Sequence, residues 1–135
     1  VTELDPGRYV LNDADLLSNA PGLTVEHCGA RFHTTVIARP TEDRAIVDAG
    51  SKTISYVDGP DPVPVGRDDV HFFRKSSEHG FVDVGEAESP VAVGDRLEFV
   101  VPNLWAVANI HDVLPAVRDG VVEDVWHVEA RGKDV

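Results

Sequence analysis

The sequence has few residues of several types, and each shortage excludes a kind of structure or a class of partner. Only one cysteine, Cys28, occurs in 135 residues, so no internal disulfide can form and a cytoplasmic location is expected. No apolar run approaches the roughly 18 residues of a membrane span. Positive charge is scarce, because 12 Lys and Arg stand against 24 Asp and Glu for a net charge of −12. Such a surface repels phosphate and anionic lipid, so we expect neither a nucleic-acid nor a membrane partner.

Methionine is also absent, and the chain opens with Val1. The missing initiator favours a piece of a longer protein. A length of 135 residues is nevertheless enough for a self-supporting hydrophobic core. We therefore expect residues 1–135 to form a single β domain, the C-terminal fragment of a longer enzyme.

Valine and the other β-branched residues dominate what is present. Valine supplies 23 residues, and Val, Ile and Thr together 33, whereas the helix formers Leu and Ala are fewer. Runs of these residues between turn residues predict strands. The expected strands are Arg8 to Leu11, Ala30 to Ala38, Ala45 to Asp48, Val70 to Arg74, Phe81 to Val84, Arg96 to Val101, Ala116 to Arg118 and Val121 to Val128. Their spacing predicts an all-β fold, a small barrel-like domain with at most one or two short helices.

Three local signals add detail to this fold. Asp119-Gly120 lies between two apolar runs and predicts a type I′ hairpin, in which both residues need a positive φ. Asn12 or Asp13 is placed to cap a short helix near Asp13 to Ser18. Residues 57–69 hold three prolines, two glycines and four aspartates, which is typical of a surface excursion.

The histidines invite a metal interpretation that their spacing does not support. No two of the six stand at His-x-His or His-x-x-x-His spacing, and the only cysteine neighbours just one of them. His79 is better placed for function, because a loop histidine beside Gly80 can meet a ligand. The alternative is that His79 only bonds its own loop.

The most distinctive loop runs from Asp48 to Lys52 (DAGSK). It leaves a strand, turns at Gly50, and presents a hydroxyl and one of three lysines. A reactive lysine needs burial or a cationic neighbour, and here an aspartate lies four residues away. The plainer interpretation is a turn that anchors two strands. Because no Gly-rich phosphate loop or nucleophile elbow is present, catalysis by this chain alone has little support.

A collinear series of segments carries a resemblance to a known family. The segments are Pro6 to Asp13 (PGRYVLND), Thr35 to Pro40 (TVIARP), Arg44 to Lys52 (RAIVDAGSK), Ser77 to Gly80 (SEHG), Val93 to Arg96 (VGDR), Val101 to Asn103 (VPN), Asn109 to Asp112 (NIHD) and Arg118 to Gly120 (RDG). In this order they resemble the C-terminal part of the D-threonine aldolase and D-serine dehydratase family, and they cover nearly the whole chain.

The family looks like the fold-type III pyridoxal phosphate enzymes. The resemblance implies a TIM-like barrel upstream of Val1 that carries the cofactor lysine, followed by a β domain of the alanine-racemase type. Pyridoxal phosphate is then expected in the parent enzyme, bound by the barrel, and not on this chain alone, since Lys52 does not match the family's cofactor lysine. The implied partners are that barrel, a second copy in a homodimer, and a small amino-acid substrate.

The resemblance fails where the family binds a metal ion. Characterised members carry His-x-Cys or His-x-Asp just after the Pro-Asn or Pro-Gly that ends the strand matching Arg96 to Val101. Here Leu104 to Ala108 offers no imidazole, thiolate or carboxylate, so no metal ligands are expected. Trp105 is expected to pack against apolar neighbours or a partner surface.

Three functional hypotheses follow from these residues. The first is an accessory domain of a pyridoxal phosphate-dependent amino-acid lyase or deaminase, which closes the active site and is inactive in isolation. Its site candidates are His79 as the catalytic group and, facing substrate or cofactor, Asn103, Asn109, His111 and Asp112. The second is a free-standing β binding or scaffold module without catalytic activity. The third is a small hydrolase built around His79 and His111. The coding sequence upstream of Val1 separates the first from the second.

Overall fold

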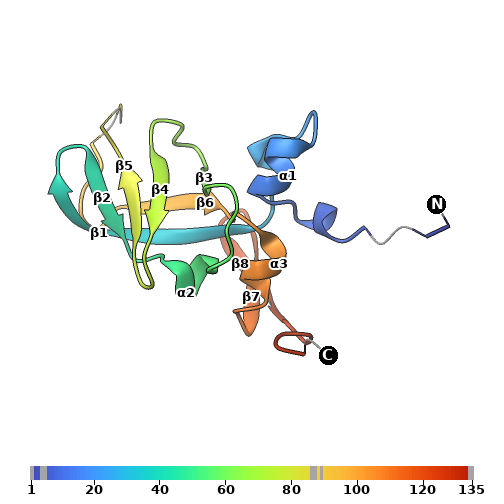
Figure 1. Ribbon diagram of the computed structural model, residues 1–135. Helices are drawn as coiled ribbons and strands as arrows, with labels where there is room; N and C mark the ends of the chain where they lie inside the picture. The colour runs from blue at the N-terminus through green and yellow to red at the C-terminus, as the bar shows by residue number, and fades with distance from the viewer. Residues whose placement is uncertain (1, 4–5, 86–87, 89, 134–135) are drawn as a thin grey trace.

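A computed structural model describes residues 2–3, 6–85, 88 and 90–133, and β-strands dominate them (Figure 1). The strands are β1 Arg31–Thr41, β2 Arg44–Val47, β3 Val63–Pro64, β4 His71–Lys75, β5 Gly80–Asp83, β6 Arg96–Val100, β7 Val113–Arg118 and β8 Val121–His127. Six form an antiparallel sheet in the order β3-β6-β1-β2-β5-β4, and β7 pairs with β8. The predicted all-β class is confirmed.

The long strand β1 organises the six-stranded sheet. It pairs with β6 on one side and β2 on the other, and its burial alternates so that Phe32, Thr34 and Val36 point inward. The outer strands β3 and β4 contact each other, so the sheet curls into a nearly closed barrel.

Three aromatic rings fill the barrel. Phe32 stacks on Phe99 with ring centroids 5.5 Å apart, and Phe72 meets Phe99 and Phe32 edge-on at 5.6 and 6.3 Å. Such pairs stabilise a core by about 0.5–1.5 kcal/mol beyond the apolar area that they bury. A Cβ on Gly80 would lie 2.3 Å from the Phe72 ring, so only glycine fits beneath this ring at the start of β5.

Short helices connect the strands. They are η1 Arg8–Val10, α1 Ala14–Asn19, η2 Val25–His27, α2 Ser51–Ile54 and α3 Leu104–Ala108, of which η1 and η2 are 3₁₀ helices. The capped helix expected near Asp13 to Ser18 is α1, and α2 and α3 come in addition to it. None of the helices in the described ranges is long or apolar enough to cross a membrane.

One expected strand is wrong. Arg8 to Leu11 forms the turn η1, in which the N–H groups of Leu11 and Asn12 both donate to the carbonyl of Arg8. The Arg8 guanidinium pairs with Asp13 and Asp15, which draws this segment toward α1 and away from the sheet. Among the described residues, no strand pairs with this segment.

The hairpin prediction is confirmed. Asp119 and Gly120 connect β7 and β8 with φ angles of 50° and 75°, as a type I′ turn requires. The 57–69 excursion also contributes the two-residue strand β3, which pairs with β6 at one margin of the sheet.

Candidate functional site

The site begins at the DAGSK turn, which a carboxylate fixes to the barrel. Asp48 accepts the Thr34 hydroxyl at 2.7 Å and the Thr35 N–H at 2.8 Å. These hydrogen bonds, the Thr34 hydroxyl first, lower the pKa of Asp48 below its ordinary value. The ionised carboxylate therefore holds the end of β2 against β1 and sets where α2 begins.

Helix α2 presses directly on the turn between β4 and β5. A Cβ on Gly50 would lie 2.5 Å from both the carbonyl carbon of Glu78 and the nitrogen of His79. The N–H groups of Ser51 and Lys52 donate to the carbonyls of Ser76 and Ser77 at 2.8 and 3.1 Å. The DAGSK and EHG segments, far apart in the sequence, thus form one rigid unit.

Lys52 and Glu78 form an ion pair across this contact, and both side chains are exposed. The carboxylate raises the pKa of Lys52, which keeps its amine protonated. A reactive lysine is favoured instead by burial or by a cationic neighbour. Lys52 has neither, because its amine is exposed and is paired with a carboxylate.

His79 is exposed, and its main chain is fixed. Its N–H donates to the Ser76 hydroxyl at 3.2 Å and its carbonyl accepts the Ser76 N–H at 2.8 Å. Within the described residues its imidazole has no hydrogen-bond partner, whereas the alternative expectation was that it bonds its own loop. The turn does so through its backbone, which leaves the ring open to a ligand.

His111 approaches the same helix from the other side. Its Nε2 donates to the carbonyl of Thr53 at 2.8 Å, and because that acceptor is a carbonyl, Nε2 carries the proton. Helices α2 and α3 are in contact. The α2–α3 face, which we define as Ser51–Ile54, Ser76–His79 and Leu104–Asp112, therefore brings His79 and His111 to one side of the barrel.

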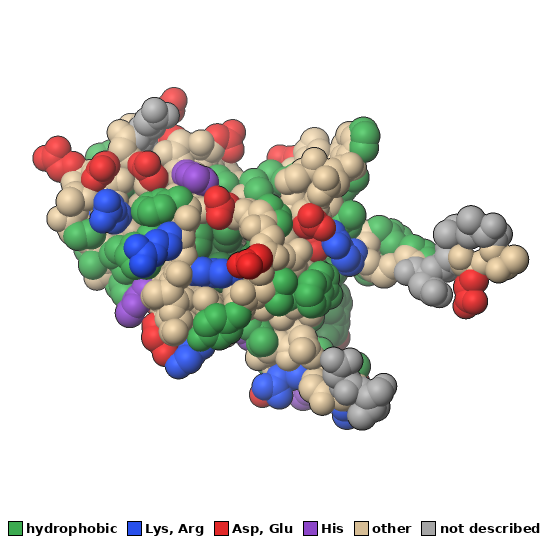
Figure 2. All heavy atoms as spheres, viewed as in Figure 1, with side chains coloured by type: hydrophobic (Ala, Val, Ile, Leu, Met, Phe, Trp, Pro, Cys, Tyr) green, Lys and Arg blue, Asp and Glu red, His purple; other side chains and the backbone are tan. Residues whose placement is uncertain are grey.

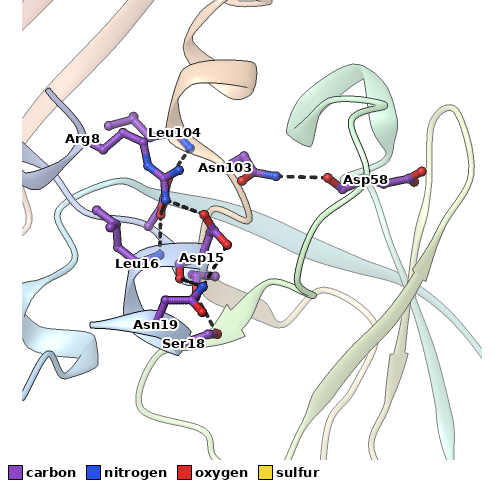
Figure 3. Close-up of polar contacts among 10 residues, drawn as sticks. Arg8, Asp15, Leu16, Ser18, Asn19, Asp58, Asn103 and Leu104 are labelled. Carbon is purple, nitrogen blue, oxygen red and sulfur yellow. Dashed lines mark hydrogen bonds and ion pairs between the residues drawn. The ribbon is translucent and has the colours of Figure 1, made fainter. Parts of the chain in front are cut away.

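Asn103 is buried just before α3. Its side-chain amide donates to the carbonyl of Asp58 at 3.5 Å, and a Cβ on Gly59 would lie 2.3 Å from that amide nitrogen (Figure 3). In this chain Asn103 thus anchors residues 57–69 against α3.

The side chains of Asn109 and Asp112 hold the C-terminal segment. The carbonyl oxygen of the Asn109 amide accepts the Gly132 N–H at 3.1 Å, and Asp112 pairs with Arg131 at 2.9 Å. Four of the five candidate side chains, all except His79, therefore contact the protein's own backbone or side chains.

Two large exposed side chains lie at this face and directly beside it. Trp105 was expected to pack against apolar neighbours or a partner surface, and it is 54% exposed in this chain; Tyr56, just after α2, was not expected. Hydrophobic side chains are visible over the region of α2 and α3 (Figure 2). Tyr56 follows Ser55, whose φ of 74° turns the chain sharply at the end of α2. The positive φ at a serine left no signal in the sequence.

The stretch in which the family carries metal ligands folds as helix α3. Leu104, Trp105 and Ala106 occupy its first turn, and none has a donor atom suited to a metal. Nowhere in the described part of the chain do three His, Cys, Asp or Glu residues form a group that could hold a metal ion. The residues present do not fit the family's metal centre.

Comparison with known proteins agrees with the order of these motifs. A family model described as "Putative serine dehydratase domain" matches residues 29–117. The chain belongs to this family. It is 36% identical over 132 residues to D-threonine aldolase of Arthrobacter sp and 38% identical over 137 residues to 3-hydroxy-D-aspartate aldolase of Paracoccus denitrificans. The predicted resemblance is confirmed.

The same fold occurs in solved structures. The crystal structure of D-threonine aldolase from Filomicrobium marinum has a TM-score of 0.85 and 32% identity, over 98% of this chain and 37% of that one. An alanine-racemase-like protein from Idiomarina loihiensis, with 20% identity and a TM-score of 0.74, shares the fold alone. The chain spans 35% of the length of the two curated relatives, so it corresponds to their C-terminal portion.

Proposed function

We propose that this serine dehydratase family domain is the accessory domain of a pyridoxal phosphate-dependent amino-acid lyase or deaminase. Its α2–α3 face closes the active site of a separate barrel domain, which holds the cofactor. Support comes from the relatives, two of which are named aldolases and are nearly three times as long as the matched segment. The parent enzyme is a homodimer that acts on a small amino acid.

The observation that carries the proposal is the open imidazole of His79 on a fixed turn. Gly50 packs against that turn without a side chain, so the ring is held at the surface in a defined place. An imidazole carried on such a turn can accept or donate a proton at a substrate atom. The Nε2–H of His111 is committed to the carbonyl of Thr53 in α2, which leaves Nδ1 as the ring nitrogen that can accept a hydrogen bond.

The cofactor supplies an electron sink for the reaction. We expect this chain not to hold the cofactor, because Lys52 is paired with Glu78 and the Lys75 amine donates to the carbonyl of Val57 at 3.2 Å. The α2–α3 face and the adjacent Tyr56 contribute apolar surface to the active site. The exposed side chains of Tyr56 and Trp105 exclude water once a second domain covers them.

Borohydride trapping tests the proposal on the chain itself. The isolated chain is incubated with pyridoxal phosphate, reduced, and weighed by mass spectrometry. We expect no near-equimolar adduct and no turnover of D-serine or D-threonine. A stoichiometric reduced adduct on Lys52 would make this chain a cofactor-binding domain in its own right and overturn the accessory role.

A further inference from the structure

The β7–β8 hairpin stands apart from the barrel. Its two strands pair only with each other among the described residues, and no residue of β8 is buried. A two-stranded hairpin is at best marginally stable in water without a surface to pack on. The hairpin nevertheless has regular pairing from Val113↔His127 to Arg118↔Val121. It therefore needs a cover that the chain itself does not supply.

Its exposed side chains are those of an interface. Val117, Val122, Val125 and Trp126 are 56%, 56%, 46% and 49% exposed. Because neighbouring residues of a strand point to opposite faces, Val125 and Trp126 project from opposite sides of the hairpin. The hairpin thus exposes apolar side chains on both of its faces, and exposed apolar surface of this kind marks a site of protein contact.

Two surface pockets lie between the hairpin and the barrel side of the chain. One, of 660 Å³, lies between Leu114 and Trp126 of the hairpin and Leu11, Val101 and Val107 of the barrel side. A second, of 640 Å³, is lined by Cys28, Pro115 and Val117 among others. Both hollows open to solvent, and the lining of the first is mainly apolar, so it offers room for apolar side chains from elsewhere. We call the hairpin and the first hollow the hairpin groove.

Among the described residues, the hydrogen bonds and the ion pair that tie the hairpin to the rest of the chain lie at its base. The Val128 N–H donates to the Asp112 carbonyl at 3.0 Å, and the Asp112 and Asn109 side chains hold Arg131 and Gly132. Toward the tip, an ion pair joins Arg118 to Glu123 within the hairpin itself. A fixed base and an open groove present an apolar surface in a set orientation.

We propose that the hairpin groove receives apolar side chains of the catalytic domain of the longer polypeptide. The proposal rests on the proposed function, and it adds the surface by which the two domains join. The matched segment is only 35% of the curated relatives' length, so most of their chain lies outside it. Helix η1 and the residues after β8 both lie at the end of the barrel that carries α3 (Figure 1). A second copy in the groove is the alternative occupant, which the concentration dependence below distinguishes.

Fluorescence and amide exchange test this surface. The sequence has two tryptophans, so Trp105→Phe leaves Trp126 as the sole reporter. Acrylamide quenching of Trp126 and hydrogen exchange over residues 121–127 are measured in this chain and in the polypeptide that joins it to the catalytic domain. We expect quenching to fall several-fold and exchange to slow about tenfold or more in the longer polypeptide.

A matched pair of variants assigns the protection to the groove. Val122→Glu places a charge on the hairpin, and Val93→Glu places one on an equally exposed valine between β5 and β6. In the longer polypeptide the first should return exchange to the rate of the isolated chain, and the second should not. Unfolding of the isolated chain, expected to be the same for both variants, excludes a simple folding defect.

The outcomes separate this inference from the proposed function. Equal accessibility of Trp126 in both forms, with the cofactor bound and an amino acid turned over, overturns the docking surface alone. Protection of the hairpin in a polypeptide that binds no pyridoxal phosphate overturns the proposed function alone. A third outcome is that the isolated chain itself becomes protected as its concentration rises and sediments as a dimer. This result would assign the groove to a second copy and would also overturn the proposal.

Discussion

Asp13 accepts the backbone N–H of Leu104 at 2.9 Å, across 91 positions of the chain. The other carboxylate oxygen of Asp13 accepts the Leu16 N–H at 2.9 Å, so one buried side chain caps both α1 and α3. Arg8 adds an ion pair to Asp13 at 3.2 Å. The residue that starts the first α-helix therefore also fixes where the α2–α3 face begins.

Asp13→Ala should lower the free energy of unfolding by about 2–4 kcal/mol, because it removes two caps and leaves buried N–H groups without acceptors. Asp15→Asn is the control: its half-exposed carboxylate pairs with Arg8 on the surface of α1, and we expect less than about 1 kcal/mol. Urea unfolding measures both. A loss for Asp13→Ala no larger than for Asp15→Asn would contradict the double cap.

Gly50→Ala should loosen the turn that carries His79. The new Cβ would meet backbone atoms of Glu78 and His79 at 2.5 Å, which cannot rotate away, so we expect a loss of about 1–3 kcal/mol. Gly7→Ala, with no atom within 4 Å, should change stability by less than about 0.5 kcal/mol. Faster amide exchange over residues 76–79 in the first variant alone would accompany the loss.

Acid should remove the contribution of Asp48. Its pKa in the folded protein lies below the ordinary value of 3.8, so its hydrogen bonds stabilise the fold above that pH and are lost as the pH falls through the lowered pKa. The difference in unfolding free energy between the wild type and Asp48→Asn should therefore be largest at neutral pH and shrink below about pH 4. A difference that stays constant from pH 7 to pH 3 would show that the charge of Asp48 has no role.

In the longer enzyme, His79→Ala should lower kcat/KM by about 10²- to 10⁴-fold, the usual contribution of a general acid or base, with an unchanged melting temperature. His71→Ala is the matched control, because His71 is also exposed but lies at the opposite end of β4, beside Asp61. Equal kinetics for the two variants would remove His79 from the reaction.

Elemental analysis should find zinc and manganese well below one equivalent in this chain, because α3 offers no ligand atoms where the family has them. The measurement is made after dialysis against each metal. Stoichiometric metal whose loss follows substitution of a residue in 102–109 would show that the family's ligand positions are matched differently.

The sequence predicted the elements whose causes are local. The Asp119-Gly120 turn depends on two φ angles, and the cap of α1 depends on an acceptor three residues from its donor, so both leave a pattern in neighbouring residues. The four residues of α2 and the five of α3 are too few for a helical period to be visible. Arg8 to Leu11 has strand composition, and only the distant ion pairs of Arg8 decide against a strand.

In the candidate site, too, the sequence predicted what depends on neighbouring residues and missed what depends on distant contacts. His79 stands out because it lies in a loop beside a glycine, but the packing of Gly50 beneath it joins segments 28 or more residues apart in the chain and could not be foreseen. Asn109 and Asp112 were expected to face a ligand, and their side chains contact Gly132 and Arg131 instead. Whether they also meet a substrate in the complete enzyme stays a prediction.

The seam between β3 and β4 bears on how this chain behaves at high concentration. A barrel that is not fully closed leaves unpaired backbone groups, onto which a strand from another molecule can add and begin an aggregate. Here the strand at one side of the seam has only two residues, Val63 and Pro64, and proline has no N–H to donate. Pro60 and Pro62 precede it directly. The prolines that first indicated a surface excursion thus protect a valine-rich sheet from intermolecular growth.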